Sequence, residues 1–203
     1  MANSEQTYIP VVGVDMLYYA KVTADSATGY TAETPKRIPG VTEAGVNMNS
    51  QTGTFYADNG PYDSAVGMGE VDVAIACADV PPALRGELYG MEYDNTTGEL
   101  ATEDLNPPYV AIQYRIQKSS GAYRYVTIYK AKAAPNEDRV QTKGGSINFQ
   151  TNGFALKGAK RLKDGRVSRM LDDDDPNLPA GVTPEIIAAK WFTDVEWAIA
   201  VGE

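Results

Sequence analysis

The sequence predicts a mainly β protein, an antiparallel β-sandwich or barrel with one short flanking helix and a short C-terminal helical tail. Apolar and polar residues alternate with a period of two along most of the chain, which is typical of strands that bury one face. Helix signals appear clearly at only two places. The 13 tyrosines, against 4 Phe and 2 Trp in 203 residues, also suit strands, because the ring can be buried while the hydroxyl stays in water.

The first half of the chain contains the earliest strand pattern and the weakest one. Val14 to Val22 alternates as a strand should, and "TPKRIPG" forms an irregular link. The stretch "VTEAGVNMNSQTGTFYAD" predicts two polar strands interrupted by glycine, whose register is loosely specified. Such strands are either completed by a partner or form an exposed hairpin. The following "TFYADNGPYD" favours a turn, since Asn59 and Gly60 accept positive φ and Pro61 fixes its own φ.

A buried strand and a short helix follow. In "GEVDVAIACAD", Val71 to Cys77 presents four apolar side chains on one face and mostly alanine on the other, so we expect both faces to be covered. In "DVPPALRGELYG", prolines precede a helix that places Leu84 and Leu88 against the sheet and ends at Gly90.

The strongest hairpin pattern is "YVAIQYRIQ", the turn "KSSGA" and "YRYVTIYK". Tyr123, Tyr125 and Tyr129 share one face of its second strand. Such a face could be a platform on which carbohydrates or bases stack, but ordinary cross-strand packing is favoured.

Two further strands are predicted before residue 170. "SINFQT" predicts a strand with Ile147 and Phe149 facing inward. "FALKGAKRLKDGRVSRML" predicts a final hairpin that turns at Asp164 and Gly165.

The composition changes near residue 171, which divides the chain into a β domain (1–170) and an acidic linker with a C-terminal arm (171–203). Asp172 to Asp175 form a solvated linker, which is favoured over a calcium site because the spacing does not match a calcium loop. Thr183 caps a short helix. The remaining apolar residues, Trp191, Phe192 and Trp197, are expected to pack on the domain or on a neighbour.

The residue inventory excludes several classes of enzyme. The chain has no histidine and a single cysteine, Cys77. Ser-His-Asp and Cys-His catalysis, His-ligated metal sites and an intramolecular disulfide are therefore impossible. Cys77 lies in an apolar strand pattern, which favours a buried, inert thiol. We predict no catalytic, metal or cofactor-binding residues and no enzyme activity, although a carboxylate-based hydrolase stays open as an alternative.

The charge balance also restricts the partners. With 18 basic and 27 acidic residues the net charge is −9, which argues against tight binding to nucleic acid or anionic membranes. The N-terminus has no signal-peptide pattern, and no apolar run approaches the ~18 residues of a membrane span, so we expect a soluble protein made in a cytoplasm. One basic cluster stands out. A solvated hairpin or a contact with an acidic copy is favoured there over a nucleic-acid patch; its members are Lys157, Lys160, Arg161, Lys163, Arg166 and Arg169.

Six stretches in order carry a resemblance to a known family. They are "VGVDMLYYAKVT", "TPKRIPGVT", "FYADNGPY", "PPYVAIQYR", "YRYVTIYKAK" and "TKGGSINFQT". Together they resemble the phi13-type major tail proteins of long-tailed bacteriophages, which form the tail tube. The resemblance implies a β-sandwich or barrel with a flanking helix, and hexameric rings that stack into a non-contractile tube for genome ejection. It also implies a virion protein of the tail, assembled in the bacterial host cytoplasm.

The same resemblance implies partners rather than chemistry. These are further copies of the chain, a tape-measure protein, and terminator and distal tail proteins. Double-stranded DNA would pass through an acidic lumen without specific binding, and neither a cofactor nor a membrane is involved. The Val41 to Asp58 segment becomes a candidate docking arm; its expected assembly contacts are Tyr56, Asp58, Asn59, Gly60, Pro61 and Tyr62. The rival interpretation is a carbohydrate-binding module on a phage or cell surface that uses the tyrosine face of Tyr123 to Tyr129.

Overall fold

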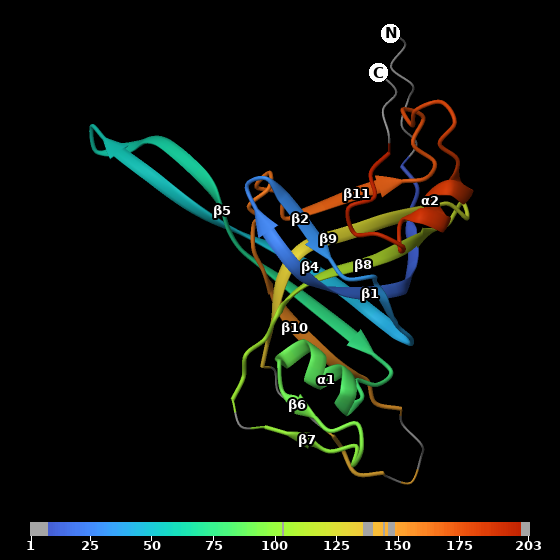
Figure 1. Ribbon diagram of the computed structural model, residues 1–203. Helices are drawn as coiled ribbons and strands as arrows, with labels where there is room; N and C mark the ends of the chain where they lie inside the picture. Colours follow the sequence, from blue (N-terminus) through green and yellow to red (C-terminus); the bar gives the residue numbers. More distant parts are fainter. Residues whose placement is uncertain (1–7, 103, 136–139, 144, 146–148, 200–203) are drawn as a thin grey trace.

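A large antiparallel sheet dominates the computed structural model, which describes residues 8–102, 104–135, 140–143, 145 and 149–199 (Figure 1). The strand order is β2-β1-β8-β9-β10-β5-β4, with β3 paired to β1 and β11 paired to β9. The mainly β prediction is therefore confirmed. The strands are β1 (Val11–Ser26), β2 (Gly29–Ala32), β3 (Lys36–Ile38), β4 (Val41–Ala57), β5 (Gly60–Cys77), β8 (Tyr109–Lys118), β9 (Tyr123–Ala134), β10 (Asn152–Gly158) and β11 (Ser168–Asp172), with a separate pair of β6 (Glu92–Tyr93) and β7 (Leu100–Ala101).

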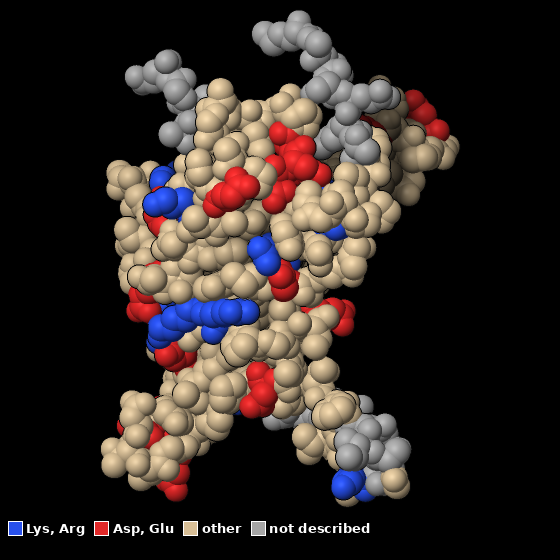
Figure 2. Space-filling model, turned by 90° about the vertical axis from the view of Figure 1, so that its right-hand side faces the viewer, with Lys and Arg blue, Asp and Glu red and all other residues tan. Residues whose placement is uncertain are grey.

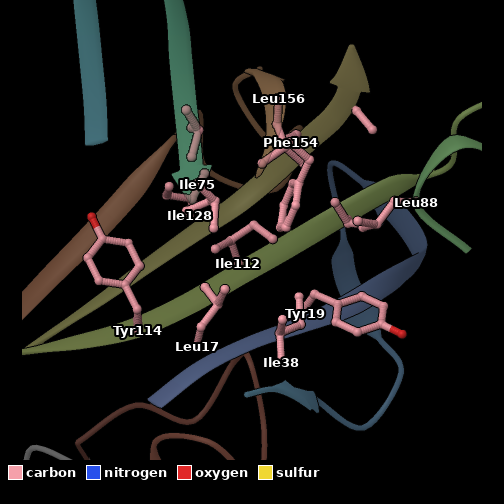
Figure 3. Packing of buried hydrophobic residues seen from close by; sticks show 14 of the residues in the cluster. Leu17, Tyr19, Ile38, Ile75, Leu88, Ile112, Tyr114, Ile128, Phe154 and Leu156 are labelled. Atoms are coloured by element: carbon pink, nitrogen blue, oxygen red, sulfur yellow. The ribbon is translucent and has the colours of Figure 1, made fainter. Parts of the chain in front are cut away.

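The sheet curls around one main core. β1 and β4 approach each other although they are not paired, so strands from distant parts of the order face the same interior. Leu17, Ile75, Ile112, Ile128 and Phe154 come from five different strands and point toward one another (Figure 3). Each is at most 3% exposed. The period-two pattern thus turns one face of each of these strands into this core, while β8 and β9 are also buried on their other face.

The segment that was predicted as two polar strands is one strand. β4 runs for 17 residues and pairs with β5 along its length. The glycines at 45 and 53 do not interrupt it, because each glycine and the residues before and after it are paired with residues of β5. The prediction that both faces of β5 are covered is also wrong: its apolar face is buried, but Ala74 on the other face is exposed.

The first helix, α1 (Pro82–Tyr89), forms where the sequence predicts it. Leu88 is fully buried and Leu84 packs at the margin of the core. Gly90 ends the helix with φ 68°, and a Cβ atom there would lie 2.0 Å from the carbonyl oxygen of Asn106. This close approach and the positive φ both require glycine.

The β8–β9 hairpin is confirmed, but the predicted final hairpin is not. β10 pairs with residues 131–134 of β9, and β11 pairs with residues 124–128 of the same strand. The two strands therefore follow one another along one edge of β9 instead of pairing together. The turn at Asp164 and Gly165 does form, with Gly165 at φ 73°.

The predicted "SINFQT" strand is also wrong where it can be checked. Phe149 is 96% exposed and belongs to no strand, while Ile147 lies outside the described residues. The sequence placed the inward strand too early, because β10 begins only at Asn152.

The C-terminal segment packs back on the sheet, as its apolar residues predict. Thr183 caps α2 (Pro184–Lys190) by accepting a hydrogen bond from the Ile186 amide. Trp191 and Phe192 then cover Tyr125, with ring centroids 5.5 and 5.9 Å from the tyrosine ring. Neither helix in the described part of the chain has the length and apolarity needed to cross a membrane.

The first two aspartates of the acidic run before α2 do not belong to a solvated linker. Asp172 belongs to β11, where Arg124 binds both its oxygens at 2.6 and 2.8 Å and Lys118 binds one at 2.8 Å. Asp173 is 6% exposed and accepts a hydrogen bond from the Tyr123 amide. A division of the chain at residue 171 stays a prediction.

Candidate functional site: a projecting arm

The outer halves of β4 and β5 continue past the sheet as a two-stranded projection, seen at the left of Figure 1. We call residues 50–68 the arm. Residues 50–56 and 61–68 are exposed on both faces of this ladder. A two-stranded hairpin with no core behind it is marginally stable in water, so the arm depends on its continuity with the body.

A break in register separates the arm from the body. Met48 lies opposite Val71, whereas Ser50 lies opposite Met68, so β5 carries one extra residue between the two pairs. A Cβ atom on Gly69 would lie 2.9 Å from the carbonyl oxygen of Asn49. Such a bulge bends the strand and increases its twist, which makes this point the root of the arm.

One face of the arm continues the apolar face of the core. Side chains alternate along β4, so Tyr56 shares the face of Met48, and the register places Val66 and Met68 on the same side. These four side chains are 69%, 44%, 69% and 53% exposed, respectively. A row of exposed apolar side chains that starts at the core is typical of a surface that meets a partner.

The tip adds an aromatic pair on the other face. Phe55 and Tyr62 meet edge to face, with ring centroids 6.3 Å apart, and they are 64% and 73% exposed. Asp58 and Asp63 are the only charged residues of the arm. The tip is therefore apolar with an acidic fringe.

The predicted contact residues come together at this tip. Asp58 and Asn59 form the turn with φ values of 50° and 62°, the backbone that a tight two-residue hairpin needs. Gly60 and Pro61 begin β5, and the two tyrosines flank the turn. Their role in assembly stays a prediction.

Sequence reasoning missed the second strand of the arm. It assigned the arm to Val41–Asp58, whereas the residues from 60 to 68, including Val66 and Met68, form half of it. Asp58 and Asn59 both tolerate positive φ and stand between two extended runs, which is a hairpin signal that could have identified this partner.

The arm also carries a free sheet edge. β4 is the last strand of the sheet order and pairs, within the residues described, with β5 only. Its outer row of backbone N–H and C=O groups is therefore open to another strand.

The tyrosine face is not an open surface on which ligands could stack across all three rings. Tyr125 and Tyr129 are 1% and 2% exposed, because the C-terminal segment covers the first and Arg161 stacks 3.7 Å from the ring of the second. Tyr123 is half-buried under the guanidinium of Arg115. Cross-strand and covering contacts thus occupy most of this face, and what stays accessible is a pocket of about 430 Å³ that Tyr123 and Tyr125 line with Arg115.

The basic cluster is largely neutralised by acidic neighbours. Arg161 is buried and pairs with Asp164 and Glu196, and Lys163 also pairs with Glu196. Lys157 pairs with Asp72 at 2.6 Å. Figure 2 shows basic and acidic side chains side by side over one face of the molecule. This pairing argues against a nucleic-acid patch.

The thiol of Cys77 and the possible metal ligands can be checked in the described residues. Cys77 is fully buried, and burial raises the pKa of its thiol to about 11, which keeps it protonated. No group of three or more acidic or cysteine side chains within those residues is placed to hold a metal ion.

The fold and the arm together define a mainly β protein with one projecting hairpin. No family model matches the chain, and no curated protein matches it. Among solved structures, it has a distant likeness to the tube-terminating cap of the anti-feeding prophage. The TM-score is 0.45 at 9% sequence identity, and the match covers 85% of this chain and 96% of that one.

Proposed function

We propose that the protein is a structural subunit that assembles with copies of itself into the stacked, hexameric rings of a non-contractile phage tail tube. The observation that carries the proposal is the arm. It exposes apolar side chains on both faces and an open strand edge, features that a partner would bury. Docking of the arm on another copy gives a head-to-tail contact, which generates rings or filaments.

The electrostatics support passage of DNA without binding. The chain carries a net charge of −9, and the basic cluster is largely paired with acidic side chains. An acidic lumen would repel phosphates and let the genome slide. In this proposal the protein lies in the virion tail after assembly in the host cytoplasm. Its other partners are a tape-measure protein, a terminator and a distal tail protein.

The test removes the arm at its root. Ser50 and Met68 lie directly opposite each other, so residues 51–67 can be replaced by an Asn-Gly turn without disturbing the body. The wild-type protein is expected to form rings or tubes in negative-stain electron microscopy and to scatter light accordingly. The deletion variant should keep its fold by circular dichroism and remain monomeric.

A single substitution refines the same test. Tyr56→Ala removes an exposed ring from the arm, and Leu162→Ala removes an apolar side chain of 63% exposure from the body as its control. Only the first should reduce assembly. Normal tubes from the arm deletion would refute the role of the arm, and a wild-type protein that stays monomeric at all concentrations would refute self-assembly.

A further inference from the structure

An apolar groove lies at the end of the β4–β5 hairpin that is opposite to the arm. It occupies about 560 Å³ between α1 and the link from β3 to β4. Five apolar residues of its lining are exposed or partly exposed to solvent. They are Pro39, Ala78, Pro81, Ala83 and Leu84.

We propose that this groove receives the arm tip of a second copy of the chain. The inference rests on the proposed function and adds the receiving surface to it. The tip presents the Phe55 and Tyr62 rings with Pro61 beside them, all exposed. If these two rings and the proline insert between Leu84 and Pro39, apolar surface of both the tip and the groove is removed from water.

Among the described residues, one basic side chain at the groove, Arg37, is free to meet an acidic visitor. Glu87, the carboxylate on the helix side, is already held by Lys36 at 2.7 Å, by Lys21 at 3.5 Å and by the Tyr19 hydroxyl at 3.0 Å. Arg37 is exposed and makes no ion pair with any residue that the structure describes. It is thus available to the tip.

Asp79 is the remaining charge on the opposite wall. Its Oδ1 accepts the Val80 amide at 2.8 Å, which orients the carboxylate but leaves its negative charge in place. The tip brings Asp58 and Asp63 and no basic residue, so Arg37 is the group at the groove that complements it.

Geometry excludes docking within one chain. Gly40 of the groove precedes the first residue of β4, and Ala78 follows the last residue of β5. The turn at Asp58 lies at the far end of the same ladder, roughly 50 Å away at the rise of a β-strand. Because the ladder is continuous, a tip cannot fold back into its own groove. Tip and groove are different surfaces, so their contact propagates from copy to copy.

Cysteine cross-linking tests the contact. Cys77 is fully buried and gives little background. An affinity-tagged Ala57→Cys chain, with its thiol beside the turn, is mixed with an untagged Ala83→Cys chain and treated with a short bismaleimide. Tagged heterodimers of twice the chain mass are expected. The matched control replaces Ala83→Cys with Ala189→Cys, an exposed alanine on α2, and should give at least tenfold less product.

Each outcome decides the inference. Selective heterodimers with the groove cysteine support it. Equal heterodimer yields from the Ala83→Cys and Ala189→Cys chains would overturn docking in the groove and leave the proposed function standing. The absence of heterodimers while the wild-type protein forms tubes would do the same. Absence of cross-links together with a monomeric wild-type protein overturns both.

Discussion

Two neighbouring aspartates of β11 and its continuation have opposite electrostatic environments. Hydrogen bonds from Arg124, and then from Lys118, lower the pKa of Asp172 below its ordinary value. Burial raises the pKa of Asp173, although the Tyr123 amide partly offsets this. The first carboxylate favours the folded state when it is charged, and the second favours it when neutral.

We expect Asp172→Asn to lower the free energy of unfolding by about 2 kcal/mol at pH 7, because it leaves Lys118 and Arg124 short of a partner. The folded pKa of Asp172 lies below the unfolded value of about 3.9. Its contribution is therefore present above that value and is lost as the pH falls through the folded pKa. Urea unfolding at pH 7 and at pH 3 would show the difference between variant and wild type shrinking in acid.

Asp173→Asn is the matched control, because the shift of this carboxyl's pKa is opposite in direction to that of Asp172. Asparagine keeps an oxygen that can accept from the Tyr123 amide but carries no buried charge. The favourable contribution of Asp173 exists below its unfolded pKa and is lost as the pH rises through its raised folded pKa. At pH 7 the variant should be as stable as wild type or more so. Equal losses from both substitutions would contradict this assignment.

Among the elements, those set by local chemistry could be predicted from the sequence. The helix α1 and its Gly90 stop, α2 with its Thr183 cap, and the β8–β9 hairpin all form as the local signals indicate. A turn at the tip was also predicted, but it forms one residue earlier than expected: the positive φ values lie at Asp58 and Asn59, whereas Gly60 already pairs with Ala57 in the ladder.

Pairing between distant strands could not be predicted in the same way. β10 and β11 are adjacent in the sequence, yet both pair with β9, because tertiary pairing overrides proximity along the chain. Asp172 looked like part of a solvated run because its partners, Arg124 and Lys118, are about 50 residues away. The groove was missed for the same reason, since three separate segments line it.

At the root of the arm, Gly69→Ala should reduce or alter assembly while the body keeps its stability. The new Cβ would lie 2.9 Å from the Asn49 carbonyl oxygen, so the bulge must shift and the arm must change direction. Gly67→Ala is the control, because its Cβ would make an ordinary contact of 3.9 Å with the Gln51 carbonyl oxygen. Electron microscopy would compare the assembly of the two variants, and a thermal melt would compare the stability of their bodies. Identical assembly by both variants would show that the bulge does not orient the arm.

The whole molecule combines a net charge of −9 with basic side chains that are mostly held in ion pairs. Copies of such a chain repel one another at long range, so the proposed association would depend on short-range contacts such as those of the arm. Salt screens the repulsion over about 10 Å at 0.1 M ionic strength. Assembly should therefore tolerate salt, unlike binding that is driven by opposite charges.

The protein is expected not to retard double-stranded DNA in a gel, even at 20 mM salt where electrostatic binding is strongest. The reason is that Arg161, Lys163 and Lys157 already have acidic partners. Retardation that disappears as salt is added, and that Lys163→Ala weakens, would instead identify the basic cluster as a nucleic-acid surface.

The long β4–β5 ladder has a consequence for how far the arm can extend. Successive side chains point to opposite faces, so inserting one residue in each strand would turn Tyr56 and its apolar row to the other side. Two residues per strand restore the facing and lengthen the ladder by about 6.6 Å. The reach of this hairpin can therefore change only in discrete steps of that size, so the distance spanned between neighbouring copies would be quantised rather than continuously adjustable.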